Sequence, residues 1–128
     1  MGDEEDARAA VAAIIAAFGE ERMDDYFALF EPDCTFLFHN VAEPMRSVQD
    51  YRDTYARWVA EDGFRIRSCA TTNTRVQVRG DVAVVTHDVR TQVEVGGEPT
   101  ELRERETIVL RKRDGRWMGV HEHLSPAP

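Results

Sequence analysis

Four ionisable residues in the second half of the chain have the types and spacing for acid/base chemistry. Asp88 and Arg90 are separated by one residue, and the carboxylates Glu106 and Glu122 follow in two later stretches. A carboxylate beside arginine stays ionised and can act as a general base, whereas one in apolar surroundings keeps its proton and can act as an acid. Such a set suits enolisation, aldol-type cyclisation or opening of an epoxide by water. The alternative is that these charges lie at strand ends in solvent.

The histidines offer a second chemistry. His121 and His123 are one residue apart, so both imidazoles would point to the same side of an extended strand. His87 and His39 could converge on them. Imidazoles bind zinc-like metals or exchange protons near neutral pH. Because this spacing is a weak metal signal without a carboxylate or cysteine nearby, structural positions in the core or at a dimer interface are favoured and no metal is expected.

Charge and motif content exclude several classes of function. The net charge of -8 disfavours nucleic acid and anionic membranes as partners, because both need basic patches. The sequence has no glycine-rich phosphate loop, GxSxG elbow or CxxC pair, and no cofactor is expected. The acidic first residues lack the features of a secretion signal, and the isolated Cys34 and Cys69 are typical of a reduced protein. A cytoplasmic location is therefore expected.

Hydrophobic spacing predicts the elements that would position these residues. It indicates a helix over residues 3–19, a short second helix that Pro32 stops, and a third helix from Ser47 to near Gly63. A compact apolar strand over residues 34–38 lies between the last two helices. Four stretches rich in β-branched residues follow, at 64–78, 82–95, 101–113 and 116–124. Helices followed by hairpins predict the α+β class, with one sheet covered on one side by helices.

Side-chain alternation divides the last three strands into two sets. The even set contains Asp88, Arg90, Glu106, Ile108, Glu122 and Leu124. The odd set contains His87, Trp117, His121 and His123. An interior even set would surround a cavity with acids and an arginine, and an interior odd set would surround it with histidines. A β-bulge would reverse this parity locally.

The terminal motif "ETIVLRKRDGRWMGVHEHLS", together with the order of helices and hairpins, resembles the nuclear transport factor 2-like superfamily. Within it, the chain is most similar to SnoaL-like proteins and to the association domain of calcium/calmodulin-dependent protein kinase II. The resemblance implies a single domain over residues 1–128. It also implies a cone-shaped fold of three N-terminal helices packed on a strongly curved antiparallel sheet, an apolar pocket, and dimers formed through the outer face of the sheet.

Two departures from these relatives bear on the site. Ketosteroid-isomerase-like enzymes carry a carboxylate base just after the first strand, where this chain has Phe38 and His39. Arginines that line the pocket of the association domain correspond to Ile108 and Leu124. The even set is therefore expected to face the cavity. The expected pocket residues are Phe38, His39, Tyr55, Trp58, Ile108 and Leu124. Trp117, His121 and His123 are expected on the outer face, at a dimer interface or in structural roles.

Family membership alone does not decide function, because this fold serves enzymes and non-catalytic domains. We expect a cofactor-independent enzyme of isomerase, cyclase or hydrolase type that acts on an apolar carbonyl or polyketide-like ligand. Asp88 would be the base, Arg90 its partner and oxyanion stabiliser, and Glu106 or Glu122 the acid. The alternative is a non-catalytic ligand-binding or oligomerisation domain. The expected partners are a small apolar organic ligand and a second copy of the chain.

Overall fold

The computed structural model describes residues 2–128, and the third of its helices begins and ends at clear local signals. The helices are α1 (Asp3–Gly19), α2 (Met23–Phe27) and α3 (Val48–Asp62). Ser47 caps α3, because its hydroxyl accepts the Asp50 backbone N–H at 3.0 Å. Gly63 ends the same helix in the left-handed region, with a φ of 63°. These two residues are the bounds that the sequence predicts for this helix.

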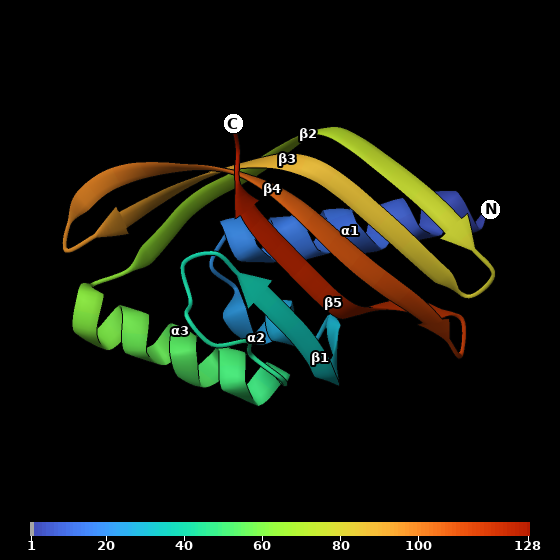
Figure 1. The fold of residues 1–128 in the computed structure, drawn as a ribbon, viewed down its shortest axis with the longest axis horizontal. Coiled ribbons are helices and arrows are strands. Elements are labelled where there is room, and N and C mark those ends of the chain that lie inside the picture. The colour runs from blue at the N-terminus through green and yellow to red at the C-terminus, as the bar shows by residue number, and fades with distance from the viewer. Residues whose placement is uncertain (1) are drawn as a thin grey trace.

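Five strands form one curved, unclosed sheet (Figure 1). They are β1 (Phe30–Phe38), β2 (Arg65–Arg79), β3 (Val82–Val95), β4 (Glu98–Arg113) and β5 (Arg116–Pro126). The order across the sheet is β1-β5-β4-β3-β2. The predicted antiparallel sheet thus gains one parallel strand at its edge, because β1 runs parallel to β5. Parallel neighbours need a long connection, which α3 and the three strands after it supply.

The second predicted helix is shorter than the sequence suggests. It ends at Phe27, and β1 already begins at Phe30, so Pro32 lies inside a strand rather than at a helix end. Proline lacks a backbone N–H and is tolerated on an edge strand, which is the position of β1. The short helix turns the chain from α1 to the sheet edge and carries Tyr26 into the interior.

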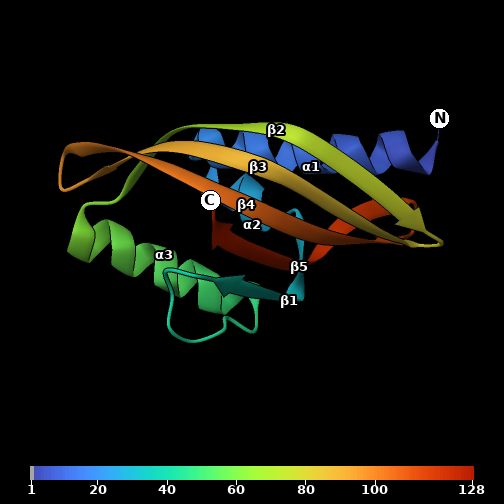
Figure 2. The ribbon, with the colours of Figure 1, turned by 45° about the horizontal axis from the view of Figure 1, so that its top comes forward.

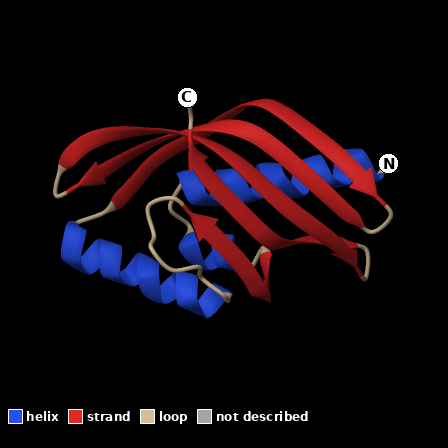
Figure 3. Cartoon of the chain, in the orientation of Figure 1, coloured by secondary structure: helices blue, strands red, loops and turns tan. Residues whose placement is uncertain are grey.

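The three helices cover one face of the sheet, here called the inner face, and leave the outer face bare (Figures 2 and 3). Helix α1 packs on β2, β3 and β5, and α3 packs on β1. The α+β architecture with a curved sheet is thereby confirmed. Among residues 2–128, no helix is long and apolar enough to cross a membrane.

Two tight turns set which side chains share the inner face. Gly96 and Gly97 form a two-residue loop that pairs Val95 with Glu98, and the turn at Asp114-Gly115 pairs Arg113 with Arg116. Each loop pairs two residues whose numbers differ by three, so an odd-numbered residue of one strand is opposite an even-numbered residue of the next. The inner face therefore takes odd residues from β3 and even residues from β4. The division into one even and one odd set across all three strands was wrong for this reason.

A β-bulge at Val120 changes the parity once more within β5. Leu110 pairs with Gly119, whereas Val109 pairs with His121, so Val120 is the extra residue. Before the bulge the odd residues of β5 face inward, and after it the even residues do. Both the core residue Trp117 and the carboxylate Glu122 consequently lie on the inner face.

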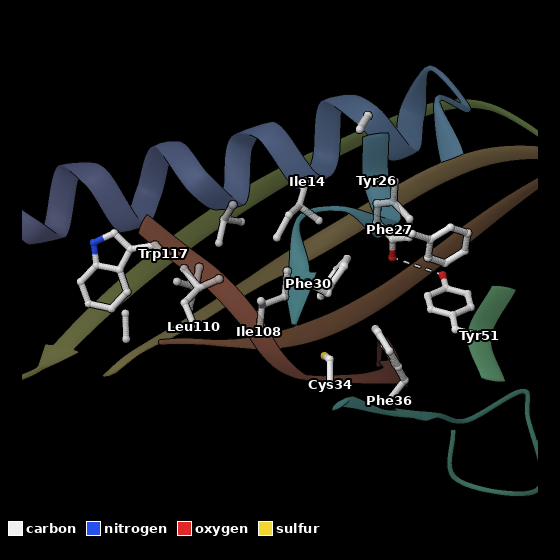
Figure 4. Close-up of a cluster of buried hydrophobic side chains, with 14 of the residues drawn as sticks. Ile14, Tyr26, Phe27, Phe30, Cys34, Phe36, Tyr51, Ile108, Leu110 and Trp117 are labelled. Carbon is white, nitrogen blue, oxygen red and sulfur yellow. Dashed lines mark hydrogen bonds between the residues drawn. The ribbon is translucent and has the colours of Figure 1, made fainter. Parts of the chain in front are cut away.

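Aromatic side chains dominate the core between helices and sheet (Figure 4). Phe36, Tyr51, Ile108 and Leu110 are among the largest fully buried side chains. Trp117 lies at the end of this row away from Tyr51 and is only 7% exposed. Its expected place on the outer face is corrected, because the odd parity of β5 before the bulge turns the indole toward the helices.

Candidate functional site

A cavity of about 70 Å³ lies between the helices and the inner face. Its walls are largely apolar and aromatic, and they come from all three helices and the sheet. The apolar and aromatic lining residues include Ile14, Ile15, Phe18, Phe38, Trp58, Phe64, Val89, Val93, Leu102 and Leu124. Polar atoms come mainly from Tyr26, Tyr51, Cys69, Thr91, Glu104, Glu106 and Glu122. No lysine or arginine is among the described lining residues, so the charge facing the cavity is acidic.

Glu106 and Glu122 form a buried carboxyl pair at the cavity wall. In the ladder between β4 and β5, Glu106 is opposite Leu124 and Glu122 is opposite Ile108, so the two carboxyls are diagonal neighbours. Both residues are less than a tenth exposed. Two carboxylates this close in apolar surroundings cannot both ionise without a large cost, so the pair holds a proton.

The environment places that proton on Glu122. Burial raises the pKa of Glu122 well above its usual range, and the nearby charge of Glu106 raises it further. Burial also opposes ionisation of Glu106, but hydrogen bonds from Glu122 and from His87 outweigh it and lower the Glu106 pKa. Glu122 is thus the member of the pair that holds the proton and Glu106 the ionised one, an arrangement that can donate a proton at one carboxyl and accept one at the other.

Two buried tyrosines extend the pair toward the helices. The Tyr26 and Tyr51 hydroxyls are 3.2 Å apart, and the Tyr26 hydroxyl donates to Oε1 of Glu122 over a long 3.5 Å (Figure 4 shows the tyrosine pair). Burial raises the pKa of both phenols well above the usual value. Both tyrosines therefore stay protonated, and with the Tyr26 hydrogen on Glu122 the Tyr51 hydroxyl donates to Tyr26.

A second histidine–carboxylate contact lies at the Glu104 end of the cavity. Nε2 of His39 lies 2.6 Å from Oε2 of Glu104, and the imidazole is partly exposed while the carboxyl is buried. Burial raises the pKa of Glu104, although hydrogen bonding to His39 opposes that shift. Asn40 also lines the cavity. His39 thus connects the lining residue Glu104 to solvent.

Comparison with known proteins identifies the family. The sequence model of the SnoaL-like domain matches residues 7–128, nearly the whole chain. The chain belongs to the SnoaL-like domain family. Among curated proteins, none matches the sequence of this SnoaL-like chain.

Solved structures with similar folds include nuclear transport factor 2-like proteins and kinase hub domains. A nuclear transport factor 2-like protein from Cytophaga hutchinsonii has a TM-score of 0.83 at 13% identity, covering 99% of this chain and 100% of that one. The calcium/calmodulin-dependent protein kinase II hub from S. rosetta has 0.80 at 20%, with coverage of 99% and 98%. The hub homology domain of that kinase from Chlamydomonas reinhardtii has 0.76 at 25%, with both chains fully covered. The likeness of the first two establishes the fold.

Asp88 and Arg90 do not belong to the cavity of this SnoaL-like domain. Their side chains point from β3 to the outer face and are 43% and 58% exposed. Asp88 accepts a hydrogen bond from Asn73 at 2.7 Å and lies 3.6 Å from Arg105. Their predicted placement as interior base and oxyanion partner is corrected, because the inner face takes the odd residues of β3. Because Asp88 and Arg90 are exposed to solvent on the opposite face, they cannot act at the buried site that contains Glu106.

The other expected site residues divide between the cavity and its surroundings. Phe38, Trp58 and Leu124 line the cavity, and His39 binds the lining residue Glu104. Ile108 is fully buried in the core beside the cavity. Tyr55 does not line it, because its hydroxyl donates instead to Glu21 on the loop after α1.

His121 and His123 lie on the outer face, after the bulge has turned Glu122 inward. Nδ1 of His121 lies 2.7 Å from the Thr35 hydroxyl, and His123 is exposed. They share no inner surface with His87, so the predicted alternative of converging histidines does not arise.

Two residues of the site were not predicted from the sequence, and a third, His87, was considered only as part of a histidine cluster. Tyr26 and Tyr51 look like ordinary core aromatics in sequence, and only tertiary packing brings them to Glu122. His87 is different, because a signal for it exists. The two-residue turn at Gly96-Gly97 fixes the register in which His87 is opposite Glu106.

Proposed function

We propose that this SnoaL-like domain binds a small, largely apolar molecule in its cavity and carries out acid/base chemistry on it without a cofactor. Glu122 is the general acid and Glu106 the general base. The observation that carries the proposal is the buried Glu106–Glu122 pair, which faces an apolar cavity. The raised pKa of Glu122 and the lowered pKa of Glu106 support these roles. Carboxyl groups separated by environment into acid and base are typical of catalytic sites.

The pair supplies the proton donor and the proton acceptor that enolisation, aldol-type cyclisation or epoxide opening requires. A carbonyl or epoxide oxygen beside Glu122 would accept its proton, and the Tyr26 and Tyr51 hydroxyls would stabilise charge that develops on that oxygen. Glu106 would take a proton from a carbon next to the carbonyl or from an attacking water. The apolar walls exclude water and strengthen each of these interactions.

The charge of the cavity favours neutral substrates over anionic ones. Its ionisable lining groups include three carboxyls, Glu104, Glu106 and Glu122, and no lysine or arginine among residues 2–128 lines it. A substrate carboxylate would enter without a counter-ion and would raise the cost of ionising Glu106. Neutral ketones, polyketide-like compounds and epoxides are therefore the substrate classes that fit.

Turnover of such compounds by matched variants tests the proposal. Glu106→Gln and Glu122→Gln keep size and hydrogen bonding but cannot transfer the proton, so each should lower kcat by on the order of 100-fold or more. Asp88→Asn is the control, because Asp88 is on the outer face, and it should leave kcat unchanged. Full turnover by both glutamine variants would rule out the acid/base assignment.

A second candidate function is self-association through the outer face. Val84 and Val109 are directly opposed there, and the next rung pairs Thr86 with Thr107, so the two central rungs of β3 and β4 are uncharged on this face. Leu37 on β1 adds an exposed apolar side chain to the same side. A sheet face that no helix covers, with uncharged rungs at the centre of β3 and β4, suits a second copy of the chain, and similar folds include kinase hub domains.

A further inference from the structure

His87 lies directly behind the carboxyl pair without reaching the cavity. Its side chain is fully buried, and Nε2 lies 2.6 Å from Oε1 of Glu106. The residue is opposite Glu106 in the β3–β4 ladder, so the backbone register itself holds the two side chains together. His87 is not among the residues that line the cavity. Any influence on a ligand must therefore pass through Glu106.

The other ring nitrogen limits which form the imidazole can adopt. Within residues 2–128, Nδ1 of His87 is buried and has no hydrogen-bond partner. An imidazolium would carry a charged N–H at this atom with no acceptor, and a proton on Nδ1 alone would also leave a buried donor unpaired. The neutral ring with its hydrogen on Nε2 leaves only a bare lone pair at Nδ1, which is the least costly of the three forms.

With its hydrogen on Nε2, His87 donates to Glu106 and to no other group. A donor to one carboxyl of a proton-sharing pair favours the ionised form of that carboxyl. The shared proton is then left to the other member, Glu122, which in turn donates to Glu106. His87 thereby makes the two carboxyls unequal, although both are buried in similar apolar surroundings.

We propose that His87 is the positioning residue that keeps the shared proton on Glu122, by donating its Nε2 hydrogen to Glu106. The inference rests on the proposed function, because it assigns the acid and base roles to particular carboxyls. It adds that these roles are set from β3, by a residue that touches no ligand. Without His87 the proton would be distributed over both carboxyls, and the cavity would present two partial acids instead of an acid and a base.

Other ionisable groups around the pair do not provide the same distinction. Tyr26 on α2 donates to Glu122 over a long 3.5 Å, which favours ionisation of Glu122 and so opposes the distinction that His87 makes. Tyr51 on α3 reaches Glu122 through Tyr26. Cys34 on β1 and Cys69 on β2 are neutral thiols, because burial raises the pKa of both, that of Cys69 to about 11. Glu104 on β4 acts on Glu106 only through its charge, and α1 lines the cavity with apolar side chains. The hydrogen bond from His87 is the contact that reaches Glu106 alone.

Carboxyl NMR of the unliganded protein tests the assignment without any substrate. Side-chain ¹³C-labelled glutamate, assigned with Glu106→Gln and Glu122→Gln, reports the protonation of each carboxyl. Near neutral pH, Glu122 should show the shift of a protonated carboxyl and Glu106 that of a carboxylate. In His87→Leu this difference should shrink as the proton spreads over both. His87→Gln is the matched control, because its side-chain N–H can still reach Glu106, and it should keep the wild-type pattern.

A folded His87→Leu protein with the wild-type carboxyl shifts would overturn the proposal. If that variant does not fold, the ¹⁵N shifts of His87 in the wild-type protein decide instead. A protonated Nε2 and a bare Nδ1 support the proposal, and an imidazolium or a hydrogen on Nδ1 refutes it. Because these readouts need no turnover, failure to find a substrate would count against the proposed function and leave the role of His87 standing.

Discussion

Gly119 of β5 lies against the ring of Phe30, so close that a Cβ atom on Gly119 would be 2.3 Å from Cδ1 of Phe30. The ring cannot move away easily, because Tyr26 and Phe36 pack on it with centroid separations of 5.2 and 5.3 Å. Glycine is therefore required at this position for packing. The contact also holds the start of β1 against β5, next to the bulge that turns Glu122 inward.

Gly119→Ala should lower the free energy of unfolding by about 1–3 kcal/mol, since the added methyl overpacks the core. Urea denaturation monitored by circular dichroism measures the loss. Gly2→Ala is the matched control, because a Cβ there has no neighbour within 4 Å, and it should change stability by less than about 0.5 kcal/mol. Equal stability of the two variants would contradict the close packing of Phe30 and Gly119.

Stability should fall with rising pH because of Glu122. Its pKa is raised by burial in the folded protein, so its contribution to stability is complete below the unfolded-state pKa of about 4.3 and is lost as pH rises through the folded-state value. Between these values only the unfolded chain releases the proton, which gives a slope of up to about 1.4 kcal/mol per pH unit.

Glu122→Gln should remove most of that slope, because the amide imitates the protonated carboxyl. Urea midpoints measured from mildly acidic to neutral pH provide the comparison. The exposed Glu98→Gln should keep the wild-type slope. The same slope in wild type and Glu122→Gln would show that Glu122 is ionised in the folded protein.

Trp117 should matter for stability and not for self-association. Trp117→Ala removes a buried indole and should cost about 3–5 kcal/mol. His123→Ala, on the exposed side of the same strand, should stay within about 0.5 kcal/mol of wild type. A stable Trp117→Ala protein with altered oligomeric state would instead place the indole on the outer face.

Self-association through the outer face should be sensitive to charge at its centre. Val109→Asp puts a carboxylate opposite Val84 and should weaken a dimer by about tenfold or more, as seen by sedimentation at several concentrations. Thr100→Asp, an exposed position toward the far end of β4, is the control and should leave the dimer intact. A wild-type protein that stays monomeric at every concentration would remove this candidate function.

Local signals in the sequence were sufficient for the elements and for the family. Ser47 and Gly63 bound a helix because of their capping chemistry, and the terminal hairpin carries the likeness to SnoaL-like proteins. The end of the short second helix was missed, because Phe30 continues the apolar pattern but belongs to β1. Its position is decided by pairing with β5, which is distant in sequence.

The candidate site was predictable in part. Glu106 and Glu122 were identified by their chemistry, but Asp88 was grouped with them by assuming one parity for all strands. The turn at Gly96-Gly97 explains why Asp88 was misplaced. A two-residue loop pairs odd positions of β3 with even positions of β4, so Asp88 and Glu106 lie on opposite faces. By contrast, nothing local in "MGVHE" distinguishes a bulge at Val120 from a regular strand, because bulge formation depends on how β4 and β5 fit the curvature of the sheet.

The bulge at Val120 also divides β5 into two segments, and the positions that are sensitive to mutation should have opposite parity in the two. Up to Gly119 the intolerant positions are odd, and they support the packing of the core. From Glu122 onward they are even, and they bear on the chemistry of the cavity. In a complete substitution scan of this strand, the alternation of sensitive and permissive sites would slip by one residue at Val120. One short strand would thus show two separate structural constraints, one from the packing of the core and one from the lining of the cavity.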